Sequence, residues 1–81
     1  MAPEIIIRQA TSADAFTLRR LAALDDARAL RGEALVAEHA GEVRAALSLE
    51  DGRAIANPFA PTADLVEMLR MHSRYAETVA A

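Results

Sequence analysis

Apolar and polar residues alternate along residues 34–57, and the rest of the chain is organised around this stretch. Successive side chains of a β-strand point to opposite faces of the sheet, so the alternation predicts strands. The pairs Ala40-Gly41 and Asp51-Gly52 interrupt the alternation and predict two tight turns, because both central residues of a type I′ hairpin turn need positive φ. We therefore expect three short strands that form an antiparallel meander with two-residue turns.

Two-residue turns would set the pairing of these strands, with Val36 opposite Ala45 and Leu47 opposite Ala56. One face of the meander is then mainly apolar, and we expect a helix to cover it; it carries Val36, Val43, Ala45, Leu47, Leu49, Ala54 and Ala56, with Glu38 as its only charge. The other face is mixed, and we expect it to be covered only in part; it carries Leu35, Ala37, Arg44, Ala46, Ser48, Glu50, Arg53 and Ile55.

Three consecutive isoleucines within Glu4–Arg8 predict a first strand that is covered on both faces. Thr11 and Asp14 predict the start of a helix, because a hydroxyl and a carboxylate satisfy the free N–H groups of a first turn, and apolar residues at helical spacing continue to Ala22. A second short helical turn over residues 27–31 would let the chain return antiparallel to the first strand, whereas a single helix would favour a parallel return. We favour the antiparallel return.

A last helix is predicted after Pro58 and Pro61, with Thr62 as its N-cap and its end near Val79. Its apolar stripe is expected to face the sheet and consists of Leu65, Met68, Leu69, His72, Tyr75, Ala76 and Val79. Residues 1–81 are therefore expected to form a single α+β domain with the element order β-α-(α)-β-β-β-α. Its sheet is four-stranded and mainly antiparallel, in the order 1-2-3-4, with packed helices.

Composition narrows the classes of function. A chain with 53% hydrophobic and 26% charged residues has the composition of a soluble globular domain. The net charge of −3 argues against a nucleic-acid partner. No apolar run approaches the roughly 20 residues of a membrane span, so we expect a cytoplasmic protein. The chain has no cysteine, which excludes disulfides and thiolate chemistry.

No residue is predicted to be catalytic or to bind a cofactor or a metal. His72 is the strongest candidate for a general base, but no residue pattern supplies a partner to orient it. We therefore interpret His72 as a histidine at the edge of the core. His39 and His72 lack the i, i+4 spacing of a helical metal site. Asp25, Asp26 and Glu33 are interpreted as parts of a solvated loop.

Residues 5–14 and 18–25 resemble the first strand and helix of the GNAT acetyltransferase superfamily, and residues 35–49 resemble its second and third strands. The resemblance covers about residues 4–57 and implies a GNAT-like N-terminal half. In the family, the fourth strand leads into a Q/R-x-x-G-x-G/A loop whose backbone amides bind the pyrophosphate of coenzyme A. Here residues 56–62 occupy the place of that loop, with no glycine and with two prolines that have no N–H.

The resemblance without this loop implies a truncated, catalytically silent GNAT-like module that acts through self-association or through a protein partner. We expect a homodimer that forms through the unpaired edge of the fourth strand or through the less covered face of the sheet. The interface candidates are Arg53, Ile55, Leu35 and Ala46. The alternative is an acyl-coenzyme A-dependent N-acyltransferase that completes its site by dimerising. Acetyl-coenzyme A is a cofactor only under this alternative, and no nucleic-acid, membrane or metal partner is expected.

Overall fold

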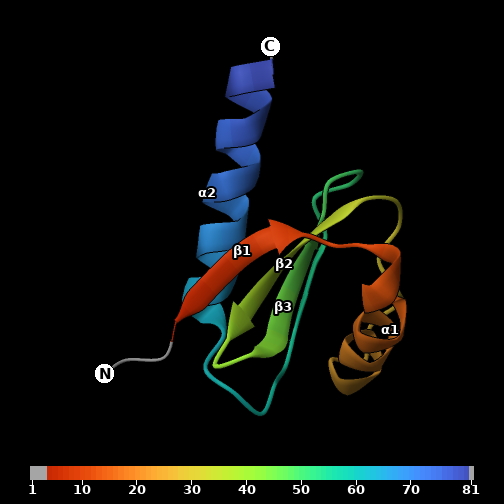
Figure 1. Cartoon of the computed structure of the whole chain (residues 1–81). Coiled ribbons are helices and arrows are strands. Elements are labelled where there is room, and N and C mark those ends of the chain that lie inside the picture. Colours follow the sequence, from red (N-terminus) through yellow and green to blue (C-terminus); the bar gives the residue numbers. More distant parts are fainter. Residues whose placement is uncertain (1–3, 81) are drawn as a thin grey trace.

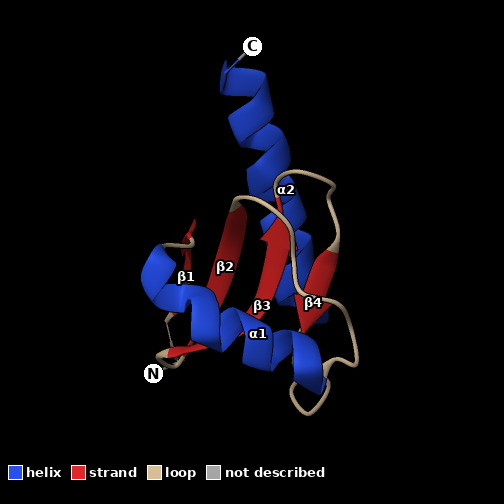
Figure 2. Cartoon of the chain, turned by 90° about the vertical axis from the view of Figure 1, so that its right-hand side faces the viewer, coloured by secondary structure: helices blue, strands red, loops and turns tan. Residues whose placement is uncertain are grey.

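The computed structural model describes the backbone of residues 4–80 and the side chains of residues 4–75. Its elements in chain order are β1 (Ile5–Gln9), a 3-10 turn (Ser12–Asp14), α1 (Ala15–Leu24), β2 (Ala34–His39), β3 (Glu42–Ser48), β4 (Ala54–Ala56) and α2 (Ala63–Ala80). The strands form one four-stranded antiparallel sheet in the order β1-β2-β3-β4 (the first three are labelled in Figure 1, and all four in Figure 2). The predicted α+β class, strand order, antiparallel return of β1 and last helix are confirmed.

The two helices cover opposite faces of the sheet (Figure 2). The core between α2 and the sheet consists of Leu35, Ala37, Ala45, Leu47, Leu65 and Leu69. The core between α1 and the sheet consists of Leu21, Ala22, Val36, Ala46 and Ile55. Both faces of the central strands are therefore apolar and covered, and the prediction that one face is covered only in part is wrong.

A β-bulge in the first hairpin explains this difference. The register shifts between Ala37 and Glu38, so that Val36 pairs with Ala46 and not with Ala45. One additional residue on β3 moves every later pair by one position, which exchanges the faces of β2 relative to those of β3. The predicted faces are therefore wrong for β2. Each side of the sheet receives apolar residues from both central strands.

The second hairpin also differs from the prediction. Leu47 pairs with Ala54, two residues before the predicted partner, because loop 49–52 replaces a two-residue turn. The buried hydroxyl of Ser48 stabilises this longer loop: it accepts hydrogen bonds from two N–H groups of the loop at 3.1 and 3.3 Å and donates to the carbonyl of Arg31 at 2.8 Å. A shift by two residues preserves the face of each side chain, so the facing of β4 is as predicted.

The turn between β2 and β3 is the predicted two-residue turn, because Ala40 and Gly41 have positive φ values of 55° and 81°. The left-handed conformation costs a non-glycine residue about 1–2 kcal/mol. Replacing Ala40 with glycine should therefore raise the free energy of unfolding by about 0.5–1 kcal/mol, net of the entropy that glycine adds to the unfolded chain. Urea denaturation measures this change.

The matched control for this turn is Ala23→Gly, at an exposed position inside α1. It should lower the free energy of unfolding by about 1 kcal/mol, because glycine is unfavourable in a helix. A loss of stability in Ala40→Gly would contradict the positive φ of Ala40.

Residues 25–33 contain no second helix, contrary to the prediction. α1 ends where Asp26 adopts a left-handed φ of 50° and the N–H of Ala27 donates to the carbonyl of Ala22 at 2.9 Å. This pair of features is typical of a helix C-terminus and turns the chain away from the helix axis. Gly32, with a φ of 68°, makes the last turn before β2.

The side chains at the start of β1 are less buried than predicted. Ile5 is 40% exposed and Ile6 is 41% exposed, whereas Ile7 packs against the core under α2. β1 is the edge strand on the side of the sheet away from β4 (Figure 2). The expectation of cover on both faces is therefore wrong for Ile5 and Ile6.

The apolar face with which α2 docks is narrower than predicted. Leu65 and Leu69 are buried, whereas His72 and Tyr75 are exposed. The interpretation of His72 as a histidine at the core edge is therefore wrong. α2 continues past the end of the sheet in both views (Figures 1 and 2), so its later turns have no sheet to pack against. The predicted stripe also includes Ala76 and Val79, which are outside residues 4–75, whose side chains the structure describes.

Candidate functional site

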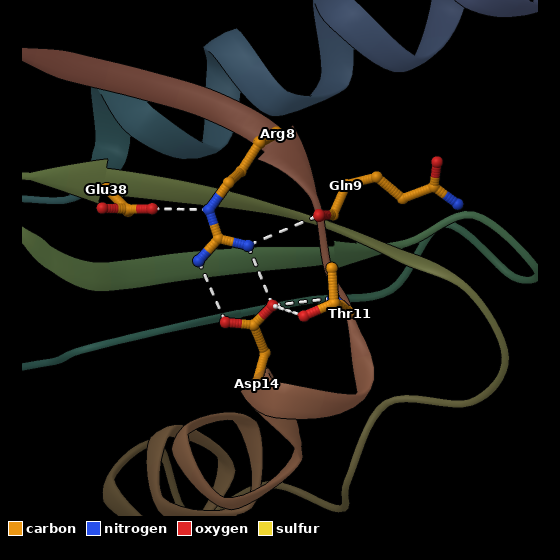
Figure 3. Close-up of polar contacts among 5 residues, drawn as sticks. All are labelled: Arg8, Gln9, Thr11, Asp14 and Glu38. Carbon is orange, nitrogen blue, oxygen red and sulfur yellow. Dashed lines mark hydrogen bonds and ion pairs between the residues drawn. The ribbon is translucent and has the colours of Figure 1, made fainter.

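Among the described residues, the most extensive cluster of charged side chains lies on the α1 side of the sheet and joins Arg8, Asp14 and Glu38 (Figure 3). β1 supplies Arg8, the 3-10 turn supplies Asp14, and β2 supplies Glu38. The Nη1 and Nη2 atoms of Arg8 donate to the two carboxylate oxygens of Asp14 at 2.8 and 2.9 Å, and its Nε donates to Glu38 Oε2 at 2.5 Å. One guanidinium thus ties three elements together through charge-assisted hydrogen bonds.

Asp14 is held in its ionised form. Its side chain is 11% exposed and also accepts hydrogen bonds from the N–H and the hydroxyl of Thr11, at 2.7 and 3.3 Å. The hydrogen bonds from Arg8, and next the one from the Thr11 N–H, hold the pKa of Asp14 far below its usual range. The hydrogen bonds to Asp14 and Glu38 raise the pKa of Arg8. Neither Arg8 nor Asp14 is therefore suited to exchange a proton near neutral pH.

An open cavity of about 480 Å³ lies above this cluster, between α1 and the turn that joins β2 to β3. Its other lining residues are Thr17, Arg20, Leu21, Leu24, Gly41, Glu42, Val43 and Asn57. The charged groups of its floor satisfy one another, because Arg8 already donates to both carboxylates. The arrangement is that of a structural clamp between β1, β2 and the start of α1.

The cluster was not predicted from the sequence, although the sequence carries one signal for it. Glu38 was the only charge predicted on an apolar face of the meander. A partly buried carboxylate needs a cation or hydrogen-bond donors, so its presence indicated a partner. The partner is Arg8, which comes within reach because β1 pairs antiparallel with β2, with Ile6 opposite Glu38. The strand pairing that brings them together is a tertiary feature.

The structure separates the four interface candidates. Leu35, Ala46 and Ile55 are buried in the two cores, so they are not available for a surface contact, and proposing them for the interface was wrong. Arg53 is partly exposed and immediately precedes β4. Its Nη2 donates to the carbonyls of Arg28 and Ala29 at 2.8 and 2.7 Å, so it fixes the connection between α1 and β2.

The outer edge of β4 is more protected than predicted. β4 has only three residues, Ala54–Ala56. The carboxylate of Asp25 accepts a hydrogen bond from the N–H of Ala56 at 3.0 Å. Asp25 is therefore a structural residue of this edge as well as part of the loop after α1. Short edge strands whose backbone groups are already occupied make poor templates for pairing with another chain.

The backbone of residues 57–62, between β4 and α2, is largely occupied by internal hydrogen bonds. The N–H of Asn57 donates to a β3 carbonyl at 2.9 Å. The N–H of Phe59 donates to Asn57 Oδ1 at 2.8 Å, and the N–H of Ala60 donates to the Asn57 carbonyl at 3.4 Å. Two further residues of this connection are prolines, which have no N–H. The connection thus offers few amides to an anionic ligand.

The part of the chain that the structure describes holds neither a group of metal ligands nor a helix that could cross a membrane. Within the described residues, no three histidine, aspartate or glutamate side chains lie close enough together to hold a metal ion. Neither described helix combines the length and the apolar character that crossing a membrane requires. Comparison with protein-family models, with curated proteins and with solved structures found no match to this chain.

Proposed function

We propose that this chain is a GNAT-like, catalytically silent module that acts by associating with a second copy of itself or with another protein. The proposal draws on the resemblance of residues 4–57 to the N-terminal half of the GNAT superfamily. The order β1-α1-β2-β3-β4-α2, with the two helices on opposite faces of the sheet, is compatible with that resemblance.

The observation that carries the proposal is the backbone of residues 57–62. In the GNAT family the corresponding loop offers free amides to the pyrophosphate of coenzyme A. Here the amides of Asn57, Phe59 and Ala60 donate within the chain, and Pro58 and Pro61 have none to offer. Opening these hydrogen bonds for a ligand would leave their acceptors unpaired, so this connection favours a structural role over cofactor binding.

Exposed apolar side chains support an association function. Met71 and Tyr75, one helical turn apart on α2, are 61% and 70% exposed. Phe16 and Phe59 are also exposed. A domain of 81 residues buries a modest fraction of its apolar surface, so contact with a partner would add stability that its own cores lack.

Two measurements test this proposal. Sedimentation velocity over a wide range of protein concentration should show that the chain associates reversibly with itself. If it does not, the chain should co-sediment with a purified protein partner. A thermal-shift titration with acetyl-coenzyme A should leave the melting temperature unchanged. A ligand at a hundred times its dissociation constant adds about 2.7 kcal/mol of stability, so binding would raise the melting temperature measurably. A clear shift would reject catalytic silence and favour the N-acyltransferase, for which the cavity beside Arg8 is the available space.

A further inference from the structure

The backbone of β1 presents an open hydrogen-bonding edge. The N–H of Ala10 donates to the carbonyl of Ala34, and the N–H of Ala40 donates to the carbonyl of Glu4. In an antiparallel ladder, residues at alternate positions direct both backbone groups to the same neighbour. Even-numbered residues from 4 to 10 therefore face β2. The backbone groups of Ile5, Ile7 and Gln9 point away from the sheet.

This edge lacks the protection that the other edge has. β1 is five residues long, whereas β4 has three residues and an N–H that Asp25 occupies. The residues whose backbone points outward are Ile5, Ile7 and Gln9, and none of them is charged or a proline. Among the described residues, no side chain accepts from the amides of these three. Of their carbonyls, that of Gln9 accepts a hydrogen bond from Arg8 Nη1 at 3.4 Å and keeps a second lone pair for a neighbouring strand (Figure 3). Natural proteins usually shield such an edge by charge, proline, a bulge or a covering element.

We propose that β1 pairs antiparallel with β1 of a second copy of this chain, with Ile7 opposite Ile7 of that copy, so that the two sheets form one continuous eight-stranded sheet. This inference rests on the proposed association function and names its surface. A two-fold axis through the Ile7 pair would set Ile5 opposite Gln9 of the second copy, and the reverse. All three outward-facing residues of each strand then form backbone hydrogen bonds.

Charge and register argue for a second copy as the occupant. In this register Arg8 lies opposite Ile6 of the second copy, so no like charges face each other. A shift by two residues in one direction would place Arg8 opposite Arg8 of the second copy, and the two positive charges would repel each other. The same shift in the other direction would pair Ile5 with Ile7 of the second copy, and the reverse, but it would leave Gln9 without a partner in β1 of that copy. The strand is therefore self-complementary in the register that is centred on Ile7.

The burial of apolar side chains also supports pairing between two copies of β1. The exposed parts of Ile5 and Ile6, 40% and 41% of these residues, flank the open edge on its two faces. Pairing would cover Ile6 with the aliphatic stem of Arg8 from the second copy, and it would bring the two Ile7 side chains together under the α2 layers. The isoleucines without cover in the single chain would thus gain cover from the pairing.

Single-cysteine variants test the register directly, because the chain has no cysteine of its own. In the proposed dimer the two copies of Ile7 have Cα atoms about 5.5 Å apart, within the range that a disulfide spans. Ile7→Cys should therefore form a covalent dimer with oxidised glutathione as the oxidant. Ile5→Cys is the matched control, because its two copies would lie four residues apart along the strands, about 13 Å. Equal cross-linking of both variants, or none for Ile7→Cys, would overturn the register.

A second pair of variants separates backbone pairing from apolar contact. Ile5→Pro removes an N–H that points away from the sheet, so it leaves the ladder of β1 with β2 intact, and it should raise the dissociation constant of the dimer about 100-fold. Ile5→Thr removes the same apolar side chain but keeps the N–H and the strand preference, and it should raise the constant by less than about tenfold. Circular dichroism should show both variants folded.

Sedimentation of these variants distinguishes the two proposals. If the chain self-associates and Ile5→Pro associates as the wild type does, the β1 interface is rejected while the association function stands. If the wild-type chain stays monomeric at every concentration, the β1 dimer falls, and capture of a protein partner alone would then uphold the association function. A loss of association that is specific to Ile5→Pro supports both.

Discussion

Replacing Leu69 with alanine should lower the free energy of unfolding by about 2–5 kcal/mol. Leu69 is completely buried between α2 and the sheet, in the core cluster that contains Leu35 and Leu47. Its removal costs the transfer free energy of the lost methyl groups and leaves a cavity. Since small domains are stable by only about 5–15 kcal/mol, this variant should be the most damaging of those considered.

Urea denaturation followed by circular dichroism measures this loss. Met71→Ala is the matched control, because Met71 lies on the same helix and is 61% exposed; its effect on the free energy of unfolding should stay within about 0.5 kcal/mol. Leu69→Met keeps the volume of the side chain and should cost less than about 1.5 kcal/mol. A loss below half of one kcal/mol for Leu69→Ala would mean that α2 does not dock on the sheet through this residue.

Replacing Asp14 with asparagine should lower the free energy of unfolding by about 1.5–3 kcal/mol near neutral pH. The substitution keeps the shape of the side chain but removes the charge from a bidentate pair with Arg8, whose bonds measure 2.8 and 2.9 Å. It also weakens the hydrogen bond that the Thr11 N–H donates at the start of the 3-10 turn. Glu67→Gln, at an exposed position on α2, should change the stability by less than about 0.5 kcal/mol.

The effect of Asp14→Asn should depend on pH with a definite sign. The clamp holds the pKa of Asp14 below its usual range, whereas in the unfolded chain the pKa is about 3.9. The stabilisation from Asp14 is therefore fully present above the unfolded pKa. As the pH falls below about 4, the unfolded chain binds a proton before the folded chain does, and the stabilisation is lost progressively. The stability difference between wild type and variant, measured by urea denaturation, should shrink over this range. A difference that stays constant would contradict the depressed pKa.

Local sequence signals predicted the four strands, the two helices and their order, but also a second helical turn over residues 27–31 that the structure does not contain. Isoleucines at 5–7, the helix start at Thr11 to Asp14, the turn at Ala40-Gly41 and the prolines before Thr62 are local signals, since each depends on the conformational preferences of a few neighbouring residues. These signals predicted the strands, both helices and the single sheet. The turn at Ala40-Gly41 was predicted correctly because two residues with positive φ are enough to define it.

Which side chains share a face depends on the register between the strands, which is a tertiary feature. The bulge between Ala37 and Glu38 adds one residue to β3, and nothing in an alternating pattern marks where such a residue is inserted. That single shift placed Val36 with Ala46 under α1 and Leu35 with Leu47 under α2, so each helix covers apolar residues of both central strands.

The candidate site was decided in the same way. The clamp of Arg8, Asp14 and Glu38 joins residues of which two are 30 positions apart, and only the antiparallel pairing of β1 with β2 brings their charges together. The exposure of His72 was likewise decided by how α2 docks on the sheet: Leu69 is buried, whereas Met68 and His72 are exposed, and helical periodicity alone does not specify which flank of an apolar stripe stays in solvent. Local preferences act over a few residues, whereas register, burial and charge pairing depend on contacts between distant parts of the chain, and for that reason only the folded structure determines them.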